Sequence, residues 1–338
     1  MSRIHSFQYL VGIVLASIIG IGLLSDVSVC QESTKPEASK RSADSPQPPR
    51  ARKKKKTPPP FQWVNPLSKA DRELPGLKHA TFVSPSLNVP VGYCIYQPPG
   101  YDLFELKTKR YPVVYYLHGG RPGSERKSIR LVNEIDKHIA AKKVAPMIYV
   151  FVNGGPVSHY NLPNQPDAQG ADIFVKELIP HIDANYRTIP QRESRGLEGF
   201  SQGGRGTARL MFRYPDLFCS AAPGGGGHAT EKRISENGGA ESTTLKFSNG
   251  DNTWDLAESY AAKHLTGSQS QGLKILVYVG DEGFNYQNNL EWMKHLESLG
   301  IEHERIIVPG VGHSALLIYE KKGLAIMKFH ARNFGLAE

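Results

Sequence analysis

One serine stands in a sequence setting that could make it a nucleophile. Residues 194–206 contain a Gly-x-Ser-x-Gly pentapeptide in which Gly199 and Gly203 flank Ser201. In a sharp turn from a strand into a helix, such a serine projects its hydroxyl outward, and the glycines keep side chains clear of the turn. The start of the helix offers free N–H groups and a partial positive charge where an oxyanion would form. The pattern therefore predicts attack by Ser201 on a carbonyl carbon.

A serine nucleophile needs a histidine as its base and an acid that orients the histidine. The strand predicted over 273–279 is followed at once by Asp281 and Glu282. Both lie just beyond the carboxyl end of a strand, where an open parallel sheet places its reactive groups. We expect Asp281 to be the acid, with Glu282 as the alternative and Asp251 and Asp255 as more distant candidates.

The base is predicted at His313. Although the chain contains 12 histidines, this one follows the last predicted strand, 306–308, in a glycine-rich turn. With Ser201 and Asp281 it keeps the order serine, acid, histidine, which is one of the known orders of such triads.

An oxyanion hole is predicted at a His-Gly-Gly turn, 118–120. This turn follows an apolar run over 111–117 that predicts a strand covered on both faces. If the turn lies beside the strand that carries Ser201, the N–H of Gly120 pairs with that of Gln202 to hold the oxyanion, and the histidine shapes the turn. The alternative is a simple tight turn.

Motifs for two other chemistries are missing. The glycine run at 223–228 lacks the Gly-Lys-Ser/Thr of a phosphate-binding loop, so we expect a flexible loop there. The chain has no Cys-x-x-Cys and no His-Glu-x-x-His pattern, so we expect no metal site.

The elements that must position these residues alternate between strand and helix. Two opening strands, 81–83 and 89–96, predict an antiparallel start. The polar segment 153–170 is expected to form a rim around the site, and the polar segment 228–253 to be an insertion near it. The alternation predicts one α/β domain, with helices on both faces of a mostly parallel sheet. A further strand is predicted over 147–152, and helices over 129–141, 172–186, 254–264, 286–299 and 315–333.

The N-terminus is typical of an exported protein. An uncharged, mostly apolar run over 9–24 follows one arginine and precedes small and polar residues, so we interpret 1–30 as a secretory signal peptide. The expected location is periplasmic, cell-surface or extracellular, with an uncleaved membrane anchor as the alternative. Such a compartment would allow a disulfide between Cys94 and Cys219, but their spacing does not indicate one.

Residues 31–60 predict a disordered, basic, Pro-rich linker before a catalytic domain over 61–338. The linker carries nine Lys or Arg against three Asp or Glu, so it accounts for six of the chain's nine net positive charges. The basic balance therefore does not argue that the domain binds nucleic acid. The alternative to a solvated linker is association with an anionic surface.

Several segments together resemble the "Putative esterase" family, which includes esterase D, enterochelin esterases, feruloyl and acetyl xylan esterases, and mycolyltransferases. The resemblance spans roughly 82–334. It implies an α/β-hydrolase fold, no cofactor, and Ser201 and His313 in the roles given above. The segments are Tyr-Pro-Val-Val-Tyr-Tyr-Leu-His-Gly-Gly (111–120), Glu-Leu-Ile-Pro-His-Ile-Asp-Ala-Asn-Tyr-Arg (177–187), Gly-Phe-Ser-Gln-Gly-Gly (199–204) and Tyr-Pro-Asp-Leu-Phe (214–218).

The resemblance does not assign the acid. Many α/β-hydrolases carry it as the last residue of a Gly-x-x-Asp turn, and that position here is Gly283. Since an exported member would meet polysaccharide esters, we expect a serine carboxylesterase acting on a small-molecule or carbohydrate-linked ester of feruloyl or acetyl type. The alternatives are an acyltransferase of the same fold and a non-catalytic binding protein on a hydrolase scaffold.

Overall fold

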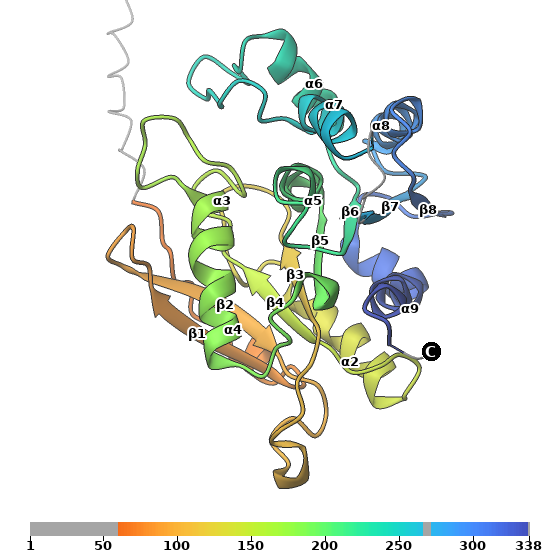
Figure 1. Ribbon diagram of the computed structural model, residues 1–338. Helices are drawn as coiled ribbons and strands as arrows, with labels where there is room; N and C mark the ends of the chain where they lie inside the picture. The colour runs from red at the N-terminus through yellow and green to blue at the C-terminus, as the bar shows by residue number, and fades with distance from the viewer. Residues whose placement is uncertain (1–59, 266–271, 337–338) are drawn as a thin grey trace, which may run out of the picture. The chain divides into compact units, whose positions relative to one another are not determined.

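The computed structural model describes residues 60–265 and 272–336, which form one compact unit (Figure 1). The predicted signal peptide and, except for Pro60, the predicted linker lie outside these residues. In the described ranges, no helix has the length and apolar character needed to cross a membrane.

An eight-stranded sheet runs through the unit in the order β1-β2-β4-β3-β5-β6-β7-β8. The opening strands β1 (Leu77–Val83) and β2 (Pro90–Tyr96) are antiparallel, as predicted, and β2 is also antiparallel to β4. All other pairs are parallel, so the sheet is mostly parallel as expected. The remaining strands are β3 (Val113–Leu117), β4 (Ile148–Val152), β5 (Arg195–Phe200), β6 (Ser220–Gly224), β7 (Lys274–Gly280) and β8 (Glu304–Val308).

Helices precede or follow these strands along the chain. Short 3-10 turns occupy η1 (Phe104–Leu106), η2 (Ile129–Leu131) and η4 (Arg192–Ser194), and η3 (Ile173–Leu178) is a π-helix. The α-helices of the described ranges are α1 (Lys69–Arg72), α2 (Val132–Ala140), α3 (Gly170–Asp172), α4 (Ile179–Asn185), α5 (Gln202–Arg213), α6 (His228–Glu236), α7 (Thr253–His264), α8 (Tyr286–Ser298) and α9 (Ala315–Asn333).

Both faces of the sheet are covered, which explains why β3 and β4 are apolar throughout. In β3, Val113 and Tyr115 belong to one hydrophobic core, whereas Val114 and Tyr116 belong to the other. The first core takes side chains from α4, α5, α7 and α8, and the second takes them from α2 and α9 (Figure 1). The predicted layering is confirmed.

The helix predicted over 172–186 is broken into α3, η3 and α4. Pro180 lies in the first turn of α4. Because proline has no amide hydrogen, the regular helical hydrogen-bond pattern is interrupted there, and the residues just before it adopt the wider π-helical turn.

Only residues 225–227 of the glycine run at 223–228 form the loop that we predicted, between β6 and α6. Pro223 and Gly224 belong to β6, and Gly225 and Gly226 are buried. A Cβ on Gly224 would lie 2.2 Å from ring atoms of Tyr278, so glycine is what lets the Tyr278 ring of β7 pack against β6.

The two polar segments expected around the site meet in a small apolar cluster of their own. Tyr160 and Leu162 come from the first segment, and Ile234 and Phe247 from the second. The rings of Tyr160 and Phe247 lie 4.0 Å apart between centroids. This contact ties the two segments to each other.

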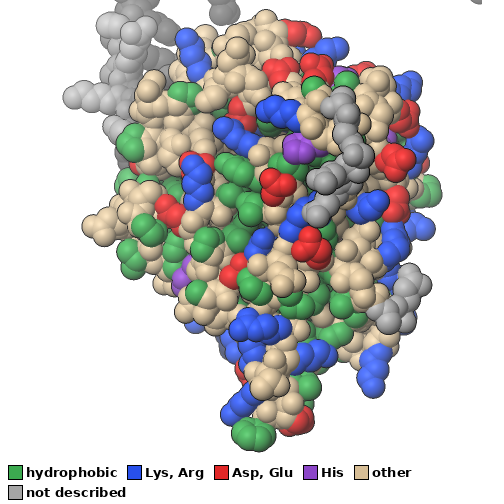
Figure 2. All heavy atoms as spheres, in the orientation of Figure 1, with side chains coloured by type: hydrophobic (Ala, Val, Ile, Leu, Met, Phe, Trp, Pro, Cys, Tyr) green, Lys and Arg blue, Asp and Glu red, His purple; other side chains and the backbone are tan. Residues whose placement is uncertain are grey.

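The surface face shown in Figure 2 carries charges of both signs, with Lys and Arg side chains interspersed among Asp and Glu. The thiols of Cys94 and Cys219 are both free and buried, so they form no disulfide with each other.

Candidate active site

Ser201 occupies the turn between β5 and α5, as predicted. Its backbone has φ +61° and ψ −117°, a strained conformation for a residue with a side chain and one that a nucleophile turn requires. The Ser201 N–H donates to the carbonyl of Gly224 at 2.9 Å, which fixes the turn against β6.

The structure brings Ser201 and His313 together although 112 residues separate them. Ser201 Oγ lies 2.8 Å from Nε2 of His313, which follows β8 and precedes α9. The imidazole ring contacts two phenyl rings, with its centroid 4.7 Å from that of Phe200 and 4.3 Å from that of Phe284. These contacts hold the imidazole against the serine hydroxyl.

The carboxylates predicted as the triad acid do not contact His313. The Asp281 carboxylate accepts the backbone N–H of Gly310 at 2.8 Å, and Glu282 is exposed. Of the more distant candidates, Asp251 pairs with arginines of α5, and Asp255 accepts from nearby hydroxyl and amide side chains. The prediction of Asp281 as the histidine's partner was wrong, because its carboxylate bonds the turn before His313 and not the imidazole.

Asn285 occupies the acid's place. Its side chain is only 2% exposed, and its Oδ1 lies 3.1 Å from His313 Nδ1. The other end of the amide, Nδ2, donates to the backbone carbonyls of Gly225 and Gly226.

This arrangement fixes the tautomer of His313. Carbonyl oxygens only accept hydrogen bonds, so the Asn285 NH2 group must face Gly225 and Gly226, and the amide oxygen must face the histidine. His313 Nδ1 therefore carries the hydrogen, and the lone pair on Nε2 faces the Ser201 hydroxyl.

Asn285 escaped the sequence analysis because the search was for a carboxylate. A Cβ built on Gly283, the position at which many α/β-hydrolases carry the acid, would lie 3.4 Å from Asn285 Oδ1. The amide of Asn285 thus lies beside the position at which many α/β-hydrolases carry the acid. The available signal was an asparagine in the loop directly after β7.

Two buried histidines shape the predicted oxyanion turn. His118 Nε2 accepts the N–H groups of Ser124 at 3.2 Å and Gly154 at 3.3 Å, so its Nδ1–H donates to Gly119 O at 3.0 Å. Burial lowers the pKa of His118 to about 4, which keeps the ring neutral. The neighbouring His159 donates from Nε2 to the carbonyl of His118 at 3.0 Å.

The turn lies beside Ser201, as the predicted oxyanion hole requires. A Cβ on Gly119 would lie 3.2 Å from Ser201 Cβ. Gln202 is the first residue of α5, so its N–H is one of those that a helix leaves without an internal partner. The N–H groups of Gly120 and Gln202 stay the predicted oxyanion donors.

The electrostatic setting suits a general base. Burial lowers the pKa of His313 below its usual 6.5, so the imidazole is neutral at neutral pH and can accept a proton from Ser201. Among the described residues, no group of three or more His, Cys, Asp or Glu side chains is placed to hold a metal ion.

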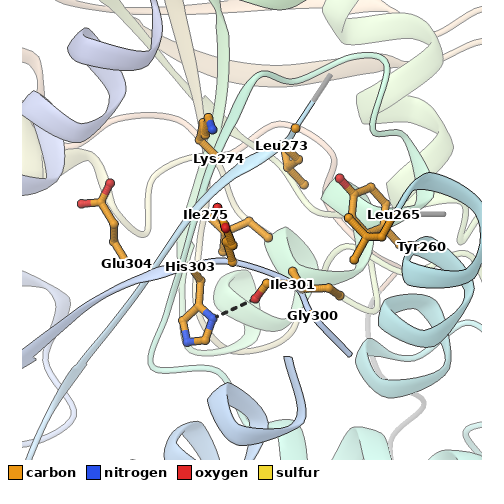
Figure 3. Close-up of a pocket in the computed structure, with 11 residues that line it drawn as sticks. Tyr260, Leu265, Leu273, Lys274, Ile275, Gly300, Ile301, His303 and Glu304 are labelled. Carbon is orange, nitrogen blue, oxygen red and sulfur yellow. Dashed lines mark hydrogen bonds between the residues drawn. The ribbon is translucent and has the colours of Figure 1, made fainter. Parts of the chain in front are cut away.

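Two cavities differ in their relation to this chemistry. One of about 500 Å³ is lined by Leu273, Lys274, His303 and Glu304, at the amino ends of β7 and β8 (Figure 3). Ser201, Asn285 and His313 follow the carboxyl ends of their strands, so that cavity lies at the other edge of the sheet. A cavity of about 360 Å³ is lined by Ser201 and Asn285 themselves.

Comparison with known proteins identifies the family to which the chain belongs. The "Putative esterase" family matches residues 84–310, which is more than half of the chain. The chain belongs to this esterase family. Its eight-stranded, mostly parallel sheet is that of the α/β-hydrolase fold.

Solved structures agree with this fold. A ferulic acid esterase superposes with a TM-score of 0.62 at 23% identity, covering 77% of this esterase-family chain and 98% of its own. The fluorophosphonate-binding serine hydrolase F of Staphylococcus aureus superposes with a TM-score of 0.60 at 16% identity. This match covers 76% of the present chain and 99% of the hydrolase.

Curated relatives match parts of the chain. An endo-1,4-beta-xylanase/feruloyl esterase of Xylanibacter ruminicola is 26% identical over 209 residues, 58% of this chain. An esterase of Mycobacterium tuberculosis is 29% identical over 124 residues, 36% of this chain. The matches span only 28% and 26% of those relatives' lengths.

Proposed function

We propose that this chain hydrolyses carboxylic esters through an acyl-enzyme formed on Ser201. The observation that carries the proposal is the 2.8 Å contact from Ser201 Oγ to His313 Nε2, on a histidine whose Nδ1 faces an acceptor. This is the arrangement that activates a serine hydroxyl.

The reaction follows from the geometry in two halves. His313 Nε2 takes the hydroxyl proton as Ser201 Oγ attacks the ester carbonyl, and the predicted N–H donors of Gly120 and Gln202 stabilise the oxyanion. His313 then gives that proton to the leaving alcohol. In the second half His313 takes a proton from water as that water attacks the acyl carbon. His313 then returns the proton to Ser201 Oγ as the bond to the acyl group breaks, which releases the carboxylic acid.

Asn285 serves this reaction as a positioning residue. It holds the His313 tautomer as an aspartate would, but it brings no negative charge to stabilise the imidazolium. Cys-His-Asn sites of papain-like proteases show that an amide can fill this role.

For the substrate, we propose an ester linked to carbohydrate, of feruloyl or acetyl type. The name of the Xylanibacter ruminicola relative supports this choice. So does Phe284, whose side chain is 83% exposed beside His313 and can stack on an aromatic acyl group. We also propose export, which rests on residues 1–30 alone.

The test uses the full chain and its Ser201→Ala variant on p-nitrophenyl acetate, butyrate and octanoate and on methyl ferulate. We expect hydrolysis by the wild type and its loss in the variant, because the variant has no nucleophile. The preferred ester then distinguishes acetyl, aryl and lipid-like acyl groups. Equal, negligible rates for both proteins would overturn the proposal and favour acyl transfer or a binding role.

A further inference from the structure

The cavity beside Ser201 has a charged lining that the proposed reaction does not use. Its wall includes Arg121, Arg205 and Glu241, with Thr230 and Phe284. Arg121 Nη1 lies 2.8 Å from Glu241 Oε2, and Arg205 Nη2 lies 3.4 Å from Glu241 Oε1. Two guanidinium groups thus share one carboxylate at the nucleophile.

A second carboxyl group, that of Glu231, lies beside Arg205 but does not cancel the excess of positive charge. Glu231 is fully buried, with Oε1 3.4 Å from Arg205 Nε, and burial raises the pKa of Glu231 well above its usual range. This shift favours the protonated, uncharged form of Glu231. Burial lowers the pKa of Arg205 only to about 10, so its guanidinium stays charged.

Arg121 has N–H donors that no acceptor among the described residues satisfies. Its Nε and Nη2 are buried and have no hydrogen-bond partner among the described residues. The guanidinium carbon lies 5.7 Å from the ring centroid of Tyr160 and 5.8 Å from that of Phe247, so two aromatic rings support its position. Unpaired donors on a fixed cation favour an anionic acceptor.

We propose that the ester substrate carries a carboxylate that binds Arg121 and Arg205 while its ester carbonyl lies at Ser201. The proposal rests on the proposed function and narrows it to esters bearing an acid group. A guanidinium fork matches the two oxygens of a carboxylate, and a site with excess positive charge selects the ionised form. The carboxylate can lie on the acyl side of the ester or on the alcohol side.

Two matched substrate pairs distinguish these sides. For the alcohol side, we compare 4-acetoxybenzoate with its methyl ester. For the acyl side, we compare mono-4-nitrophenyl adipate with methyl 4-nitrophenyl adipate. Within each pair the ester bond to be cleaved is the same, and the distant group is charged in one member and neutral in the other.

The ratio of kcat/KM between charged and neutral members is measured in the full-length wild type and three variants. Arg121→Gln removes one cation, and we expect the wild-type preference to fall about 10- to 100-fold, the range of a charge-assisted hydrogen bond. Glu241→Gln removes the competing carboxylate, so the preference should rise. Arg305→Gln removes an exposed arginine that pairs with Glu297, and it should leave the ratio unchanged.

A preference in either pair that depends on Arg121 supports the proposal and identifies the side. Equal rates on charged and neutral esters, or a preference that survives in Arg121→Gln, would overturn it while the esterase activity stands. If none of the four esters is hydrolysed faster than by Ser201→Ala, the proposed function fails, and this inference fails with it.

Discussion

Asn285 differs from an aspartate in two ways that matter for His313. It is neutral, so it does not favour the imidazolium, and it has a donor end that bonds Gly225 and Gly226. An asparagine without such partners could turn its NH2 group to the histidine and select the wrong tautomer. The two carbonyls prevent that rotation here.

Removing the amide should therefore impair catalysis more than binding. We expect Asn285→Ala to lower kcat by roughly 10²- to 10⁴-fold with little change in KM, because His313 loses the acceptor that sets its tautomer. Asn289→Ala is the matched control. Asn289 bonds Gly226 and the Asn285 carbonyl without touching His313, so a similar loss in both variants would show that the loop matters and the acceptor does not.

Restoring a carboxylate should move the pH profile. The wild-type pKa of His313 is lowered by burial, so kcat/KM should fall on acidification only below about pH 6.5. In Asn285→Asp, an adjacent negative charge favours the protonated imidazole and raises its pKa, by about 1–3 units for a close partner. The fall of kcat/KM on acidification should therefore occur at a higher pH than in the wild type. An unchanged pH dependence would argue against contact between residue 285 and His313.

At this scale the sequence predicted that Ser201 and His313 lie together, and it missed the side chain that bonds His313. Ser201 and His313 were recoverable because each follows a strand in a glycine-rich turn and because their order is restricted. The third member was not, since Gly283 leaves its usual position empty and nothing in the local sequence shows that Gly225 and Gly226 would orient an amide.

The turn between β5 and α5 requires the backbone of α5 to approach that of β3 closely. A Cβ on Gly203 would lie 1.9 Å from the Leu117 carbonyl oxygen and 2.8 Å from that of His118. Gly203→Ala must therefore push α5 away from β3 and the oxyanion turn.

We expect Gly203→Ala to lower the free energy of unfolding by about 1–3 kcal/mol or more, as overpacking does. Urea unfolding measures the change. Gly312→Ala is the control, since a Cβ at Gly312 would meet nothing within 4 Å and its φ is not positive. Equal free energies of unfolding for the two variants would contradict the packing described for the turn between β5 and α5.

Most elements were predictable from the hydrophobic pattern. Apolar runs located six of the eight strands, all except β5 and β6, to within a few residues. The covering of both sheet faces was inferred from the continuous apolar character of the run at 111–117. The π-helical break before Pro180 and the strand character of Pro223 and Gly224 were not predictable. Both depend on how neighbouring elements pack and not on local propensity.

At the scale of the whole molecule, buried neutral histidines link folding to pH. Burial lowers the pKa of His118 to about 4 and that of His228 to about 3, against 6.5 when exposed. The unfolded chain therefore binds more protons between those values. The contribution of these two histidines to the free energy of unfolding is fully present above pH 6.5 and is lost as the pH falls toward 3.

Removing one such histidine should flatten this dependence. His228 stacks on Trp292 with ring centroids 4.1 Å apart, so phenylalanine can replace it without loss of the stack. In His228→Phe, the slope of unfolding free energy against pH between about pH 4 and 6 should fall by up to one proton, about 1.4 kcal/mol per pH unit. Identical slopes from urea melts would show that His228 is not buried as a neutral ring.

The central claim is that His313, oriented by Asn285, activates Ser201. Its most direct test is the rate of labelling of the full chain by a fluorophosphonate, followed by intact mass with the modified residue mapped, in the wild type and Asn285→Ala. We predict one adduct per chain on Ser201, formed at a rate that falls below about pH 6.5 and is at least about 100-fold slower in the variant at neutral pH. Labelling at another residue, or equal rates in the two proteins, would contradict the account.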